Sequence, residues 1–172
     1  MLFCLISKWE WTIHREFFHH LLTRSSYLLD ITIDQSNGKA SKATVLSSLV
    51  ESAMWMEYAL KADMENSSSA ALLKNLGLAY LHIVRSDSKL FSHKKVRRSL
   101  TKTEIGSIDL LPYISEVWLA DTVDNPEEIK KWATKRWSEC WGEYLLTDNA
   151  KEEGSYAQVK QIYDEVHKKL LK

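Results

Sequence analysis

Residues 124–146 read DNPEEIKKWATKRWSECWGEYLL, and this stretch decides the fold class of the chain. Asn125 can accept hydrogen bonds from the first free N–H groups of a helix, Pro126 suits the first helical position, and two glutamates follow at the positive end of the helix dipole. Apolar residues then recur at steps of three and four, which makes one broad apolar face. The pattern predicts an amphipathic helix whose buried face comprises Ile129, Trp132, Ala133, Trp137, Cys140, Trp141, Tyr144 and Leu145.

The composition favours a single helical domain over residues 1–172. The chain has only 5 Gly and 2 Pro, whereas sheets joined by tight turns usually need more of both. Its 23 basic and 23 acidic residues cancel, so no overall field steers it towards nucleic acid or membranes. The two cysteines, Cys4 and Cys140, make neither a metal set nor a disulfide framework, and Cys140 is expected to be a buried small hydrophobe rather than a reactive thiol.

The same helical periodicity recurs along the rest of the chain. It predicts further helices over residues 7–33, 41–64, 69–85, 112–122 and 155–171, with polar loops at 34–38 and 147–154. Residues 86–107 are predicted to form a polar loop with a short helix around 90–100. We therefore expect an all-α fold, either an irregular antiparallel bundle or a short repeat-like stack of six to seven helices. Its core should include Leu76, Trp132, Trp137, Trp141 and Tyr163.

One fragment favours the stack. Leu73, Leu76, Gly77 and Tyr80 match the first helix of a tetratricopeptide repeat, in which the small Gly allows two helices to pack closely. The Ala expected about nine residues after the Tyr is Lys89 here, and no second copy of the pattern occurs. The fragment thus indicates repeat-like packing and not a repeat array.

A dense basic run provides the candidate binding site. Lys94, Lys95, Arg97 and Arg98 could bind phosphate or another anion, in nucleic acid, a lipid headgroup or a phosphoprotein. No aromatic residue is interleaved to stack on bases, so specific nucleic-acid binding is not expected. A solvated loop is the favoured interpretation, with weak and non-specific binding at best.

Other motifs are explained more simply by structure than by chemistry. His14, His19 and His20 lie beside Glu16, but the Glu-x-x-His step of di-iron bundles is not repeated, so no metal or cofactor is expected. The acidic residues Glu127, Glu128, Glu152 and Glu153 fall at helix starts and in loops, where solvation and dipoles account for them. No phosphate-binding glycine loop or nucleophile elbow occurs, which argues against an enzyme.

Two features leave the cellular compartment open. Asn66-Ser67-Ser68 is a glycosylation sequon, which matters only in the secretory pathway. Residues 1–7, MLFCLIS, are apolar but too short for a membrane span and lack the basic start of a signal peptide. They are expected to pack on the bundle, with the end of a membrane segment from a longer parent chain as the alternative.

The order of these segments resembles the soluble helical region that follows the membrane domain in transmembrane protein O-mannosyltransferases. The resemblance rests on four features in order along the chain. These are an aromatic first segment (Trp9, Trp11, Phe17 and Phe18), the helix with Lys74-Asn75 and Tyr80, a helix rich in basic and aromatic residues, and a final helix that ends in Lys. It covers most of the chain but includes no diagnostic motif. It implies a non-catalytic appendage in or at the endoplasmic reticulum and assigns no site residue, because the catalytic residues of that family lie in its membrane portion.

The sequence thus leads to two functional hypotheses. The first is a non-catalytic, cytoplasmic helical module for protein interaction or scaffolding, which binds its partner through a groove or an exposed apolar strip. This hypothesis rests on the abundance of Trp and Tyr on helices that carry no catalytic motif, since these residue types are enriched at binding hot spots. The second is the accessory helical region of a membrane-bound glycosyltransferase, detached from its membrane domain. The partner is expected to be another protein, with at most weak peripheral contact with a membrane.

Overall fold

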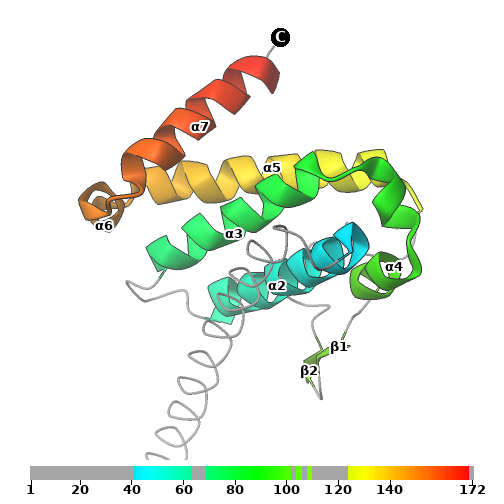
Figure 1. The fold of residues 1–172 in the computed structure, drawn as a ribbon. Coiled ribbons are helices and arrows are strands. Elements are labelled where there is room, and N and C mark those ends of the chain that lie inside the picture. Colours follow the sequence, from blue (N-terminus) through cyan, green and yellow to red (C-terminus); the bar gives the residue numbers. More distant parts are fainter. Residues whose placement is uncertain (1–40, 63–68, 102–103, 106–107, 110–123, 171–172) are drawn as a thin grey trace, which may run out of the picture.

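The computed structural model describes residues 41–62, 69–101, 104–105, 108–109 and 124–170. These residues form six α-helices, so the all-α prediction is confirmed (Figure 1). The helices predicted over residues 7–33 and 112–122, the histidines at 14, 19 and 20, and the sequon at Asn66 lie outside the described residues.

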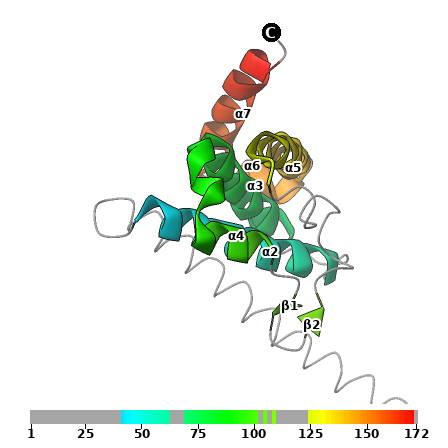
Figure 2. The same ribbon diagram turned by 90° about the vertical axis from the view of Figure 1, so that its right-hand side faces the viewer.

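Three long helices carry the core. They are α2 (Lys42–Ala62), α3 (Ser69–Arg85) and α5 (Pro126–Leu146), and α3 packs against both of the others. Figure 1 shows α3 between α5 and α2, and Figure 2 shows α2 crossing below the other two. Side chains of these three helices make up most of the buried apolar cluster.

Side-chain caps account for where two of these helices, α2 and α5, begin. Ser41 Oγ accepts a hydrogen bond from Thr44 N at 3.2 Å at the start of α2. The side chain of Asn125 accepts from the backbone N–H groups of Glu127 and Glu128, with Pro126 as the first residue of α5. These bonds satisfy N–H groups that have no partner within the helix.

The core predictions are confirmed at four of five positions. Leu76, Trp132, Trp137 and Trp141 are buried, as is Cys140. Tyr163 is only half-buried. It lies on the last helix, α7 (Tyr156–Leu170), which among the described elements packs on α5 and α6 and leaves its other sides to solvent.

The close packing expected at Gly77 occurs between α3 and α5. A Cβ atom at this position would lie 2.1 Å from Cδ1 of Trp141, far inside van der Waals contact. The indole of Trp141 also donates a hydrogen bond to the backbone carbonyl of Lys74 at 2.9 Å. The indole therefore sits directly on the backbone of α3.

The short helix predicted around residues 90–100 is present, and both predicted loop segments contain more structure than expected. Between α3 and α5 lie a 3₁₀ helix, η1 (Ser88–Ser92), the helix α4 (Lys94–Leu100) and a ladder of two residues per strand, β1 (Glu104–Ile105) with β2 (Ile108–Asp109). The segment after α5, predicted as a polar loop, contains the short helix α6 (Asp148–Glu152). Propensity alone does not reveal such short helices, because their contacts with the core stabilise them.

Candidate functional site

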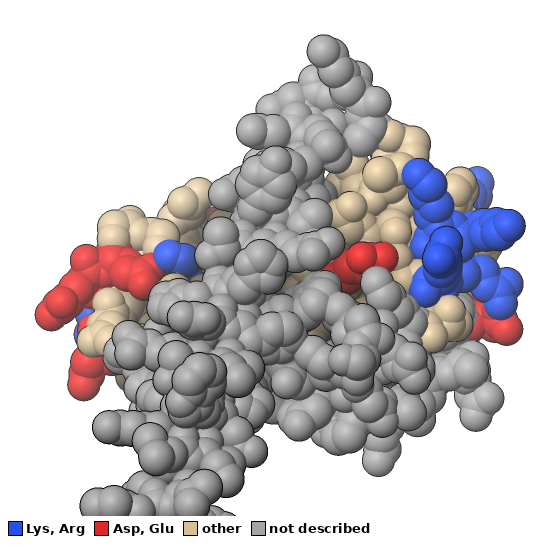
Figure 3. All heavy atoms as spheres, turned by 90° about the horizontal axis from the view of Figure 1, so that it is seen from below, with Lys and Arg blue, Asp and Glu red and all other residues tan. Residues whose placement is uncertain are grey.

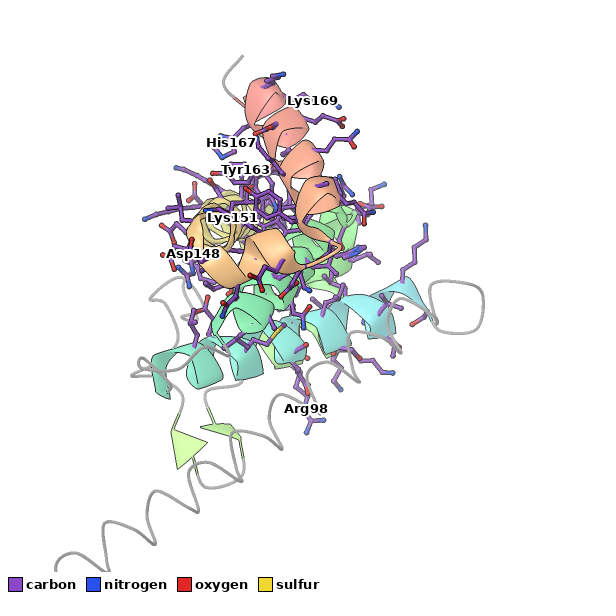
Figure 4. All side chains as sticks on the ribbon, turned by 90° about the vertical axis from the view of Figure 1, so that its left-hand side faces the viewer. Arg98, Asp148, Lys151, Tyr163, His167 and Lys169 are labelled. Atoms are coloured by element: carbon purple, nitrogen blue, oxygen red, sulfur yellow. The ribbon has the colours of Figure 1, made fainter. Side chains whose placement is uncertain are left out.

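The basic run forms the outer face of α4, the short helix predicted around residues 90–100, and is not a solvated loop. Lys94, Lys95, Arg97 and Arg98 are all exposed. On the inner face, Val96 and Leu100 are buried and the helix packs against α2. We call the four exposed residues the α4 basic surface. Figure 3 shows Lys and Arg side chains gathered at this end of the molecule, and Figure 4 shows Arg98 extending away from the helices.

Polar contacts hold α4 in place at both of its ends. At its start, Nδ1 of His93 accepts from the backbone N–H of Lys95 at 3.3 Å. Near its end, the buried hydroxyl of Ser99 lies 2.7 Å from the Ser47 hydroxyl and donates to a Glu51 carboxylate oxygen at 3.1 Å. The basic side chains therefore project from a helix with a fixed orientation.

Acidic residues border the α4 basic surface. Arg97 forms an ion pair of 2.5 Å with Asp124, which precedes α5, and Asp87 caps η1. Glu127 accepts a hydrogen bond from Ser88 at 3.1 Å, which places the first turn of α5 beside η1. Of the four basic residues, Arg97 makes this ion pair, and the Lys95 ammonium donates a hydrogen bond to the Thr44 hydroxyl at 3.2 Å. The result is a small positive surface with a negative margin.

A buried ionic network joins the three long helices at the centre of the fold. Glu57 of α2 is 3% exposed and accepts two hydrogen bonds of 2.8 Å from Arg136 of α5, one on each carboxylate oxygen. Tyr80 of α3 donates to the same carboxylate at 2.8 Å, and Arg136 also donates to Glu139 at 2.6 Å. The charges are thus paired within the protein.

Burial and the Glu57 carboxylate keep the Tyr80 hydroxyl protonated, and Glu57 keeps the Arg136 guanidinium charged, near neutral pH. Burial raises the pKa of the Tyr80 hydroxyl well above its usual range, and the neighbouring Glu57 carboxylate adds to the effect. Burial lowers the pKa of the Arg136 guanidinium, but the hydrogen bonds and charge of Glu57 outweigh this and raise it overall. Burial also raises the pKa of Cys140 to about 12, so its thiol stays protonated.

A second polar cluster lies at the opposite end of the molecule from α4, where α6 turns into α7 (Figure 1). One carboxylate oxygen of Glu153 accepts from Lys74 at 2.5 Å, from the Tyr144 hydroxyl at 3.1 Å and from the Ser155 hydroxyl at 3.2 Å. The hydrogen bond from Lys74 is the main reason that the pKa of Glu153 is lowered. Solvation alone, the sequence-based interpretation, therefore does not describe Glu153.

A hydroxyl–imidazole pair connects α5 to α7. The Ser138 hydroxyl lies 2.8 Å from Nε2 of His167, whose ring lies tilted against the rings of Tyr163 and Trp137. Figure 4 shows Tyr163 and His167 on the same side of α7. Ser138 lies in the middle of α5, where backbone N–H groups already bond within the helix. They are therefore not available to stabilise an oxyanion, as acyl transfer would require.

The part of the chain that the structure describes contains neither a metal-binding group of side chains nor a membrane-spanning helix. No three His, Cys, Asp or Glu side chains are grouped there to hold a metal ion. No helix among these residues has the length and apolar character needed to cross a bilayer.

Comparisons with known proteins give no relative. No protein family, no curated protein and no solved structure matches the chain. The resemblance to O-mannosyltransferases stays a prediction.

The two polar clusters had no recognisable signal in the sequence. Glu57 and Arg136 are 79 residues apart, and so are Lys74 and Glu153, and neither pair belongs to a motif. Only the spacing of the core stripes of α3 and α5 could have indicated that Tyr80 and Arg136 would lie near each other.

Proposed function

We propose that this chain is a non-catalytic helical interaction module that binds an acidic segment of another protein through the α4 basic surface. The observation that carries the proposal is the presentation of four cationic side chains by one helix with a fixed orientation. The three described Trp residues are buried in the core, so they do not supply the exposed apolar strip considered from the sequence.

The fixed position of α4 favours binding. A flexible basic loop loses conformational entropy when it binds, and this loss reduces affinity. The backbone of α4 is already ordered by Val96, Ser99 and Leu100, all buried against the rest of the protein. Binding then orders only the ends of the basic side chains.

The negative margin favours a protein partner over a polyanion. A seven-residue helix is about 10 Å long, so the positive surface is small compared with the footprint of a nucleic-acid duplex. Phosphates beyond this footprint would meet the carboxylate of Asp124, which borders Arg97. A protein segment can place acidic residues on α4 and neutral or basic residues beside the margin, which makes the two surfaces complementary.

A peptide-binding experiment tests the proposal. The probes are a fluorescein-labelled peptide with four Asp or Glu residues spaced along one face, a DNA duplex, and vesicles containing phosphatidylserine. If each exposed ion pair contributes about 0.5 kcal/mol, replacing all four basic residues with Ala should weaken peptide binding roughly 30-fold. The matched control removes the same charge elsewhere by Ala at the exposed residues Lys131, Lys151, Lys168 and Lys169.

The control variant should bind the peptide within about threefold of the wild type, and binding should weaken with added salt. Circular dichroism should show that both variants remain folded. Equal losses in the two variants would overturn the proposal, because binding would then follow net charge alone. Tighter binding to the duplex or the vesicles than to the peptide would assign the surface to a different class of partner and would also overturn it.

A further inference from the structure

We propose that Lys74 and Tyr144 form a binding site for a carboxylate group, and that Glu153 of the same chain fills this site as an internal ligand. The proposal is independent of the α4 basic surface, which lies at the other end of the molecule (Figure 1). It assigns a ligand chemistry to residues that no sequence motif singled out.

The donors converge as they do around a bound ligand. A single oxygen, Oε2 of Glu153, accepts from the Lys74 ammonium, the Tyr144 phenol and the Ser155 hydroxyl at 2.5, 3.1 and 3.2 Å. Charge-assisted hydrogen bonds of this kind are stronger than those between neutral groups. They favour the ionised form of the carboxylate, and the pKa of Glu153 is accordingly lowered.

The two principal donors belong to the rigid part of the fold. Lys74 is on α3 and Tyr144 on α5, and these helices pack closely where Trp141 donates to the Lys74 carbonyl. Tyr144 is buried. Burial also raises the pKa of its hydroxyl, which therefore keeps the proton it donates. The backbone positions of these two donors are therefore set by the packing of α3 on α5 and not by Glu153.

The internal ligand belongs to a much less constrained segment. Glu153 follows α6, a helix of five residues in which only Ala150 is buried and which has no side-chain N-cap. Its side chain is 29% exposed, so solvent reaches the site. A Cβ atom added to the next residue, Gly154, would meet no other atom within 4 Å, so space surrounds this turn.

A covalently attached ligand has an effective concentration in the millimolar range or above. A free monocarboxylate therefore competes poorly with Glu153 in the wild-type protein. In a variant that lacks the Glu153 side chain, the site is open to the free ligand. The ligand class is a carboxylate, such as an acidic side chain or a chain terminus of a peptide. Its binding and the docking of the turn between α6 and α7 exclude each other.

Chemical rescue of the full-length chain tests the site, with sodium acetate as the probe and sodium chloride at equal ionic strength as the reference. Glu153→Ala should lower the Tm, and acetate should restore roughly 3 to 5 °C at ten times its Kd. Glu153→Ser, a second variant that opens the site, should respond in the same way. Glu153→Gln should not respond, because its amide still fills the site.

Two further variants decide between this site and a general salt effect. Glu152→Ala removes an exposed neighbouring charge and should show no acetate response. Adding Lys74→Ala to Glu153→Ala should abolish the response. An equal acetate response in the wild type, in Glu152→Ala or in the double variant would overturn the proposal. Rescue by phosphate and not by acetate would overturn the assignment of a carboxylate ligand.

Discussion

Replacing Gly77 with Ala tests the closest approach between α3 and α5. The added Cβ would lie 2.1 Å from Cδ1 and 2.3 Å from Nε1 of Trp141. Carbon atoms in contact are usually about 3.5 to 4.0 Å apart, so the indole must move by more than about 1 Å. It is fully buried, and its N–H already donates to the carbonyl of Lys74 at 2.9 Å.

Three terms set the expected magnitude. Over-packing of a core costs about 1–3 kcal/mol, and loss of the buried hydrogen bond costs about 1–3 kcal/mol more. The better helix propensity of Ala offsets about 1 kcal/mol. The net loss of unfolding free energy is therefore roughly 1–5 kcal/mol, a fall in Tm of roughly 2 to 20 °C for a domain of this size.

Urea and thermal unfolding followed by circular dichroism measure this loss. Gly142→Ala on α5 is the matched control, because its Cβ would be tight only against the hydroxyl oxygen of Tyr163, at 3.2 Å. The end of this half-exposed side chain can shift, so we expect a change within about 1 kcal/mol. Trp141→Phe should reduce the cost of Gly77→Ala, since the smaller ring leaves room for the methyl group. If Gly77→Ala were as stable as the wild type, or if Trp141→Phe left its cost unchanged, the steric argument would be wrong.

Three other predictions concern the core and one helix cap. Glu57→Ala should lower the unfolding free energy in urea by about 1–3 kcal/mol, because the buried Tyr80 hydroxyl loses its acceptor and Arg136 keeps only its bond to Glu139; a loss below about 0.5 kcal/mol would contradict this. The pKa of Cys140 is raised from 9.0 to about 12 by burial, so the folded state keeps a proton that the unfolded state releases. The resulting contribution of Cys140 to the unfolding free energy is complete below pH 9 and is lost as the pH rises towards 12, at up to about 1.4 kcal/mol per pH unit. Cys140→Ala should remove this part of the dependence of the unfolding free energy on pH. An unchanged pH dependence would refute the prediction. Asn125→Ala should cost about 1 kcal/mol in thermal unfolding by removing the N-cap of α5, and no measurable change would show that the cap is unimportant.

The sequence predicted the features that depend on local periodicity. The start of α5 at Asn125 and the burial of Trp137 follow from residues adjacent along the chain or one helical turn apart, and both are confirmed. The short helix predicted around residues 90–100 is present as α4, but the basic run that it carries was interpreted as a solvated loop. The exposed face of α4 is almost entirely basic, which is also typical of a solvated loop, whereas burial of Val96 and Leu100 and the hydrogen bonds of Ser99 stabilise the helix.

The long-range pairs could not be predicted for a different reason. Gly77 indicated that some helix would approach α3 closely, but nothing near it indicated that the contact would be Trp141. The partner of Glu57 was equally hidden among 23 basic residues. Such pairings depend on the final packing of the helices, which the apolar stripes alone leave open.

The Glu57–Arg136 ion pair has a consequence for the uniqueness of the fold. Apolar contacts have no direction, so α5 could slide along α3 by one turn, about 5.4 Å, and still bury a largely apolar face. The same slide would separate the guanidinium from its carboxylate and leave a charge without a partner inside the protein, which is strongly unfavourable. We therefore expect this pair to select one alignment of the helices among several that the apolar residues would tolerate, even where it adds little to the overall stability.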